Sequence, residues 1–76
     1  MEKSMSNGDD KKNIAINHLK MKLKEHQEAI AFAQTFYEDR KKSEPEMVDY
    51  YEQLKKRAIS YHQKEIDKIE HKLENI

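Results

Sequence analysis

Apolar side chains recur every three or four residues over most of the chain, in two long stretches. The first stretch, from Lys11 to Lys41, alternates steps of three and four, which is the spacing of one face of an α-helix. The second begins at Glu44, and its mean step is close to the helical repeat of about 3.6 residues. The pattern predicts an all-α fold with one helix over residues 11–41 and another over residues 44–75.

Each predicted helix carries one continuous apolar stripe that contains a single histidine. Outside these stripes the helices are mostly charged, so the stripes are the surfaces that should meet. The stripe of the first helix consists of Ile16, Leu19, Leu23, His26, Ile30, Ala33 and Tyr37, and that of the second consists of Met47, Tyr51, Leu54, Ala58, His62, Ile66, Ile69, Leu73 and Ile76.

The segment between the two stretches has the residues of a sharp turn. Pro45, the only proline, disfavours helical geometry in Glu44 but is tolerated in the first turn of a new helix. Ser43 and Glu46 have the spacing of a capping box, in which each side chain accepts a hydrogen bond from the other residue's amide. We therefore predict a turn at residues 42–44 and an antiparallel hairpin. The alternative is one long helix kinked at Pro45.

Folding the chain back at this turn places the two apolar stripes opposite each other. Tyr37 then lies near Tyr51, and His26 lies within about one helical turn of His62. Residues 1–10, which include the only glycine, are predicted to form a disordered tail. The chain is therefore expected to hold one domain, the helical hairpin of residues 11–76.

Composition indicates that a single hairpin has few apolar residues with which to form a core. Charged residues make up 39% of the chain and apolar residues 36%, and there is no cysteine to form a disulfide. Both phenylalanines and all four tyrosines lie in the half next to the turn. We therefore predict a homodimer in which two hairpins form a four-helix bundle. The residues expected in its core are Ile30, Ala33, Phe36, Tyr37, Tyr51, Leu54 and Ala58.

The balance of charge and the lack of long apolar runs bear on the expected partners and location of the protein. Fifteen basic residues are balanced by fifteen acidic ones in mixed order, so nothing in the total favours binding to nucleic acid or to an anionic membrane. No run approaches the ~18 apolar residues of a membrane span, and no apolar secretion signal begins the chain. We expect a cytoplasmic protein that binds no membrane and no cofactor.

Chemical motifs are sparse. His26, His62 and Glu65 could approach one another, but a metal site needs three or more converging ligands, and the chain has no His-x-x-x-His or Glu-x-x-His pair. We expect no bound metal and predict that the two histidines hydrogen-bond to each other, to Tyr61 or to water. There is also no nucleophile with a neighbouring base and no glycine-rich phosphate loop, so we expect no enzymatic activity.

One known family of small helical hairpins is similar to this chain in architecture. The second helix carries Tyr51-Glu52-Gln53-Leu54-Lys55 near its start. The sporulation aspartyl-phosphate phosphatases are similar small helical hairpins, with Ser-Gln-Glu-Leu-Asp on their second helix. The present segment lacks that acidic ending, so the similarity is one of architecture, and no family is recognised. A phosphatase-like regulator is the third and weakest of the functions considered.

The sequence is best interpreted as a small non-enzymatic regulator or adaptor that binds another protein as a homodimeric hairpin. The expected anchors are Phe32, Tyr50 and Tyr61, since aromatic residues dominate the energy of protein interfaces, with Lys56 and Arg57 as charges at the edge. The alternative function is a nucleic-acid-associated protein that binds through lysine-rich helix surfaces, and its binding would weaken steeply with added salt.

Overall fold

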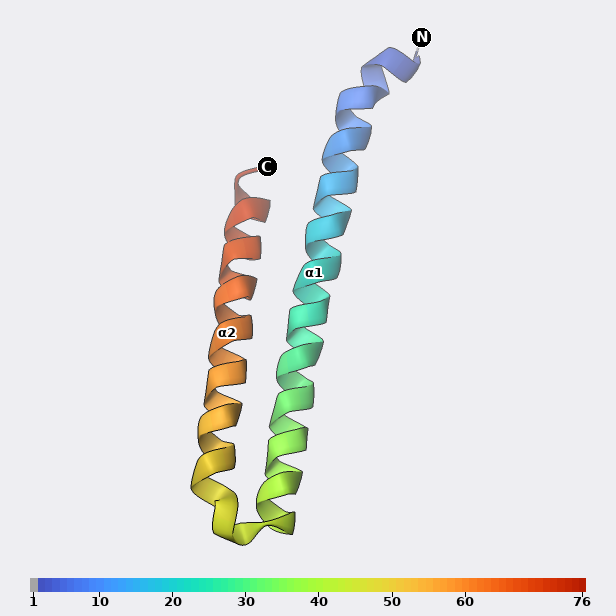
Figure 1. Ribbon diagram of the computed structural model, residues 1–76. Coiled ribbons are helices and arrows are strands. Elements are labelled where there is room, and N and C mark those ends of the chain that lie inside the picture. The colour runs from blue at the N-terminus through green and yellow to red at the C-terminus, as the bar shows by residue number, and fades with distance from the viewer. Residues whose placement is uncertain (1) are drawn as a thin grey trace.

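The computed structural model describes the backbone of residues 2–76 and the side chains of residues 10–76. Its elements are helix α1 (Glu2–Ser43), the 3-10 turn η1 (Pro45–Met47) and helix α2 (Val48–Glu74). Figure 1 shows α1 and α2 side by side and antiparallel, with the N-terminal end of α1 extending beyond the C-terminus. The described residues contain no strand. The predicted all-α, two-helix hairpin is thus confirmed, while its dimerisation into a four-helix bundle stays a prediction.

The far ends of the helices differ from the predicted boundaries to different degrees. α2 ends at Glu74, next to the predicted end at residue 75. α1 begins at Glu2, earlier than the predicted start at Lys11. The side chains of residues 1–9 lie outside the described residues, so the predicted disordered tail over residues 1–10 stays a prediction.

The turn is built differently from the one predicted at residues 42–44. α1 continues through Ser43, and only Glu44 leaves the helical conformation, with φ −131° and ψ 73°. Pro45–Met47 then forms η1, so that α2 begins at Val48 rather than at Glu44. The proline acts as expected, because Glu44 before it is not helical and Pro45 itself begins a helical turn. The alternative of one kinked helix is excluded, because α2 runs back along α1.

The predicted capping box between Ser43 and Glu46 does not form. Ser43 keeps a helical backbone, and its hydroxyl donates a hydrogen bond to the carbonyl oxygen of Asp39 at 3.1 Å. A serine inside a helix commonly bonds back to the preceding turn in this way. Neither η1 nor α2 has a side-chain cap. Instead, backbone bonds close the turn, from the Glu44 amide to the Arg40 carbonyl at 2.8 Å and from the Met47 amide to the Glu44 carbonyl at 2.9 Å.

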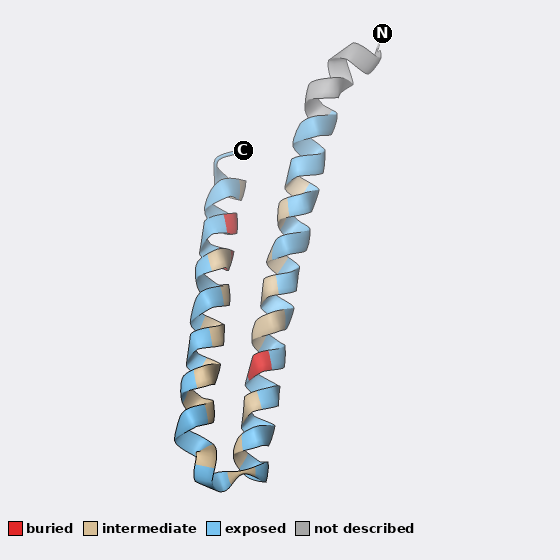
Figure 2. Ribbon diagram, viewed as in Figure 1, coloured by how far each residue is buried: buried red, intermediate tan, exposed pale blue. Residues whose placement is uncertain are grey.

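The two helices meet along one line of side chains, here called the seam. His26 opposite His62 and Tyr37 opposite Tyr51 fix its register. The buried side chains are Ala33, Ile66 and Ile69. The other positions along the seam are half-buried, drawn in tan in Figure 2, because two helices leave water on two sides of every contact. The half-buried apolar residues of the two long helices and the turn are Ile16, Leu19, Leu23, Ala29, Ile30, Tyr37, Met47, Tyr51, Leu54, Ala58, Ile59 and Leu73.

The hairpin is long and narrow. Its long dimension is 67 Å and its shortest is 10 Å, the dimensions of a two-helix rod. Over the residues described, neither helix contains a stretch that is both long enough and apolar enough to span a bilayer.

Candidate functional site

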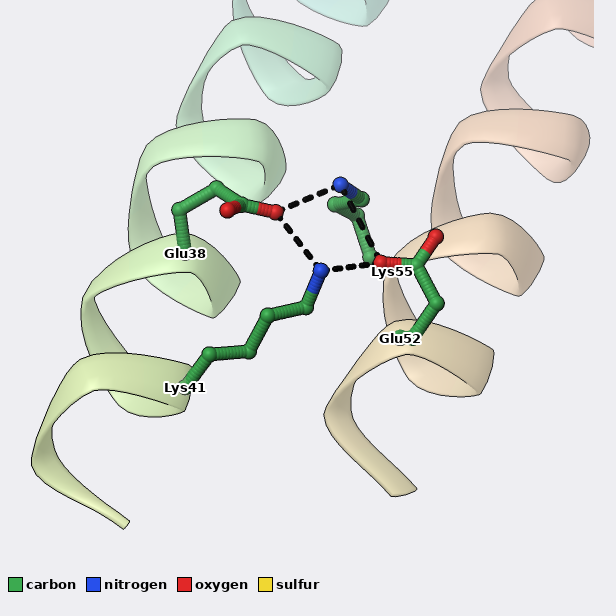
Figure 3. Close-up of polar contacts among 4 residues, drawn as sticks. All are labelled: Glu38, Lys41, Glu52 and Lys55. Carbon is green, nitrogen blue, oxygen red and sulfur yellow. Dashed lines mark hydrogen bonds and ion pairs between the residues drawn. The ribbon is translucent and has the colours of Figure 1, made fainter. Parts of the chain in front are cut away.

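Four charged side chains join the helices next to the turn (Figure 3). The ammonium group of Lys41 lies 2.8 Å from Glu38 Oε2 on its own helix and also contacts Glu52 on α2. The ammonium group of Lys55 lies 2.6 Å from Glu38 Oε2 and 3.4 Å from Glu52 Oε1. Each lysine is therefore placed between one carboxylate from each helix. These four residues form a closed ring of alternating charge, here called the ion-pair cluster.

Mutual hydrogen bonds keep the ion-pair cluster charged over a wide pH range. Hydrogen bonds from Lys41 and then Lys55 lower the pKa of Glu38 from its ordinary 4.5 to about 2. The hydrogen bond from Lys41 also lowers the pKa of Glu52, and those to Glu38 and Glu52 raise the pKa of Lys41. Water reaches the cluster and screens its charges, so it contributes less to stability than its geometry suggests. Its position across the helices favours one register of the hairpin.

The ion-pair cluster was not predicted from the sequence, although the sequence contains a signal for it. The spacing Glu-x-x-Lys occurs shortly before the turn, at residues 38–41, and again shortly after it, at residues 52–55. Residues three apart are neighbours on a helix surface, so each pair forms by itself. In an antiparallel hairpin the two pairs then lie opposite each other with their charges crossed, as the structure shows.

The side of the hairpin opposite the ion-pair cluster carries exposed aromatic residues. Phe36 and Tyr50 each precede a glutamate of the cluster by two residues, which is about 200° around a helix. Phe32 lies one turn before Phe36, and Tyr61 lies three turns after Tyr50 on the same side of α2. The four aromatic side chains therefore point to one side of the molecule, here called the aromatic face.

The aromatic face is open to solvent. Phe32 is 68% exposed, Tyr61 58%, Tyr50 53% and Phe36 37%. On α1 the rings of Phe32 and Phe36 stack with their centroids 5.6 Å apart, and the guanidinium carbon of Arg40 lies 5.2 Å from the centroid of Phe36. This distance is within the range of a cation–π contact. On α1 the spacing of four residues from Phe32 to Phe36 and from Phe36 to Arg40 is the sequence signal that places these three side chains on one side of the helix, outside the seam.

The structure separates the two predicted edge charges. Arg57 lies one turn before Tyr61 and two turns after Tyr50, so it belongs to the aromatic face. Lys56 lies one turn after Glu52, on the side of the ion-pair cluster. Both side chains are exposed. Of the predicted anchors and charges, the geometry thus brings together Phe32, Tyr50, Tyr61 and Arg57, adds Phe36 and Arg40, and leaves Lys56 apart.

The predicted core residues are distributed between the seam and the aromatic face. Ala33 is buried, whereas Phe36 is exposed in the single hairpin. The remaining five are half-buried in the seam, where the Tyr37 and Tyr51 rings are 6.3 Å apart. Tyr51 also donates a hydrogen bond from its hydroxyl to Glu44 Oε2 at 2.9 Å, which raises the pKa of the phenol. The five half-buried residues are Ile30, Tyr37, Tyr51, Leu54 and Ala58.

The two seam histidines contact each other, as predicted. Nδ1 of His26 and Nδ1 of His62 are 2.8 Å apart, across the interface between α1 and α2. The Tyr61 ring lies edge-on to both imidazoles, with centroids 6.3 Å from His26 and 5.0 Å from His62. Hence the sequence pattern placed both histidines correctly in the seam.

Within residues 10–76, no three His, Cys, Asp or Glu side chains are grouped so that they could hold a metal ion, and no pocket is present. Comparison of the chain with protein-family models, with curated proteins and with solved structures gave no significant match. The aromatic face is therefore the candidate functional site, and its chemistry is that of a binding surface.

Proposed function

We propose that this protein is a small non-enzymatic regulator or adaptor that binds another protein and acts as a homodimeric helical hairpin. The observation that carries the proposal is the aromatic face, with Phe32, Tyr50 and Tyr61 each more than half exposed on one side of the rod. Solvent exposure of three large aromatic side chains on one side is unfavourable unless another surface covers them.

The composition of the aromatic face supports protein recognition. Tyr, Phe and Arg are enriched at the centres of protein interfaces, whereas Lys and Glu are depleted there. Arg40 over the Phe36 ring and Arg57 between Tyr50 and Tyr61 give this face two guanidinium groups among four aromatic rings. Both groups can hydrogen-bond to carboxylates or backbone carbonyls of a partner while the rings supply apolar contact.

The length of the exposed apolar strip on α1 supports the homodimer. Ile14 and Met21 lie five and three helical turns before Phe32, on the same side of α1, and are 67% and 61% exposed. Together with Phe36, a residue of the predicted dimer core, they form a strip along α1, and Tyr50 and Tyr61 on α2 are left to the partner. A second hairpin presents an equally long strip. Because the net charge of the chain is zero, no net charge repulsion opposes the association of two copies. Two hairpins paired in this way make a four-helix bundle.

The arrangement of charges gives less support to the nucleic-acid alternative. Lys41 and Lys55 are held between carboxylates in the ion-pair cluster, so they are not available to phosphate groups. Lys22 also pairs with Glu25, at 3.8 Å. A nucleic-acid surface requires basic side chains gathered on one side without neighbouring carboxylates.

The experiment is a comparison of matched variants in pull-down from host lysate. Phe32→Ser and Tyr50→Ser alter the aromatic face, and Val48→Ser is the control. Val48 has the same exposed fraction as Phe36, 37%, but lies one turn before Glu52 on the side of the ion-pair cluster. We expect one protein partner to be retained by wild type and by Val48→Ser and to be lost from both aromatic variants.

Two other outcomes would contradict the proposal. Equal retention by all variants would show that the aromatic face is not the binding surface. Recovery of nucleic acid alone, released by salt at about 0.5 M, would support the nucleic-acid alternative instead. Thermal melts of each variant show whether lost binding reflects loss of folding.

The homodimer has its own test, light scattering coupled to size exclusion. We expect about twice the chain mass of 9.2 kDa at tens of micromolar protein. Phe36→Ser should lower the mass toward that of a single chain, whereas Val48→Ser should leave it unchanged. If the wild type has the mass of a single chain, the homodimer is contradicted, and the aromatic face is left for a different protein.

A further inference from the structure

The contact between His26 and His62 has a chemical requirement that no other seam contact shares. An Nδ1–Nδ1 distance of 2.8 Å is a hydrogen bond, so one Nδ1 carries a proton and the other offers a lone pair. Two neutral imidazoles satisfy this condition, and so do one cation and one neutral ring. Two imidazolium ions cannot, since two N–H groups and two positive charges would then face each other.

We propose that this histidine pair is an acid-sensitive lock on the open half of the hairpin, which tolerates a first added proton and opens with the second. The open half comprises the seam beyond the pair, away from the turn, and contains the buried Ile66 and Ile69. The inference is independent of the proposed function, because it concerns the contact between α1 and α2 within one chain.

The charged neighbours of the histidine pair are already in ion pairs, and its titratable aromatic neighbour is a phenol. On α1, Lys22 lies one turn before His26, and its ammonium group is 3.8 Å from Glu25. On α2, Glu65 lies one turn after His62, and its carboxylate is 3.2 Å from Lys68. The Tyr61 ring contacts both imidazoles, and a phenol is neutral throughout mild acid. The two carboxylates near the pair are thus each already matched by a lysine on their own helix.

The sign of the effect follows from proton counting. The closed hairpin can bind one extra proton at the pair, whereas the opened hairpin can bind two. Acid therefore favours the open state, and stability falls as the pH decreases through the range in which imidazoles ordinarily titrate, about pH 7 to 5. The ion-pair cluster is unaffected in this range, because Glu38 is protonated only in stronger acid. Mild acid should therefore loosen the open half while the half next to the turn stays closed.

The test is a series of thermal melts from pH 7.5 to 5 on the full chain at one protein concentration. His62→Gln removes one titrating group of the pair. His18→Gln is the matched control, because His18 is an exposed histidine of α1 outside the seam. We expect wild type and His18→Gln to lose about 5 °C or more in Tm over this range, and His62→Gln to lose less than half as much. An equal loss of Tm in wild type, His18→Gln and His62→Gln would overturn the proposal.

A second measurement covers the case in which His62→Gln folds poorly. In wild type, NMR titration of the two imidazoles should show two separate steps, because a pair that shares one proton titrates as a unit. The amides of Ile66 and Ile69 should exchange faster after the second step, corrected for the intrinsic rate, while those of Tyr51 and Leu54 stay protected. A single common step with unchanged exchange at Ile66 and Ile69 would also overturn the proposal.

Discussion

Next to the turn, polar and aromatic contacts join α1 and α2 in addition to aliphatic ones, whereas beyond the histidine pair the seam is aliphatic. The turn half contains the ion-pair cluster and the ring contact between Tyr37 and Tyr51. The open half contains Ile66 and Ile69, which are 5% and 7% exposed. The register of the seam places Ile69 opposite Leu19. More aromatic surface lies in the turn half, yet both buried isoleucines lie in the open half.

The difference shows what burial requires when only two helices are present. A side chain is covered only if it lies on the centre line of the seam, where the opposite helix reaches both of its sides. Ile66 and Ile69 occupy that line, and in the turn half Ala33 occupies it. The bulky Phe36 lies about a quarter turn away and stays accessible. The apolar content of a stretch is therefore a poor guide to its burial in a single hairpin.

The largest expected effect comes from truncating a buried isoleucine. Ile69→Ala should destabilise the protein by about 2–4 kcal/mol, because it removes buried methyl groups and leaves a cavity. Phe36→Ala should cost clearly less in a single hairpin, and Met21→Ala, at an exposed position, less again. Urea denaturation of the three variants gives these values. If Phe36→Ala costs as much as Ile69→Ala, Phe36 is covered by a second chain, as the homodimer requires.

The second prediction concerns acid stability in the turn half. Because the pKa of Glu38 is about 2 in the folded protein and ordinarily 4.5, its ion pairs stabilise the fold above pH 4.5. That contribution is lost as the pH falls from 4.5 toward 2. Melts in this range should show a smaller loss for Glu38→Gln than for wild type. Glu28→Gln, an exposed glutamate on the same helix, is the control and should behave like wild type.

A third prediction distinguishes Tyr51 from the other tyrosines. Its hydroxyl donates to Glu44, and losing that proton would place two negative charges together, so its pKa lies above the ordinary value of 10. An absorbance titration in alkali should show one late-titrating phenol that is missing from Tyr51→Phe. In Glu44→Gln the same phenol should titrate earlier. A late phenol that survives in Tyr51→Phe would refute the contact.

The smallest expected effect is at Ser43. Its hydroxyl bonds back to the Asp39 carbonyl, an interaction that contributes little to a helix. Ser43→Ala should change stability by no more than about 0.5 kcal/mol. A capping serine would instead cost about 1 kcal/mol on replacement by alanine. Chemical denaturation distinguishes the two cases. A loss of about 1 kcal/mol would mean that Ser43 caps the following helix, as the sequence predicted.

The sequence by itself determined the two helices, their antiparallel order and most members of the seam. The exception is Ile76, which was predicted for the stripe of the second helix but is 42% exposed beyond the end of α2. Apolar spacing and the isolated Pro45 are local signals, and helix formation and chain reversal depend on local geometry. The contact between His26 and His62 was also predictable, since an antiparallel register follows once the turn is placed.

Only the tertiary structure decided which seam residues are buried, how the turn closes and what the outer sides carry. Burial depends on how closely two helices approach and on which side chain lies at the centre of the contact, as Ile66 and Phe36 show. The bond from Ser43 to Asp39 is one of two local alternatives for this hydroxyl, and the sequence is compatible with both. The crossed pairing of Lys41 with Glu52 and of Lys55 with Glu38 requires the two helices to be side by side, because its atoms come from segments that are distant along the chain.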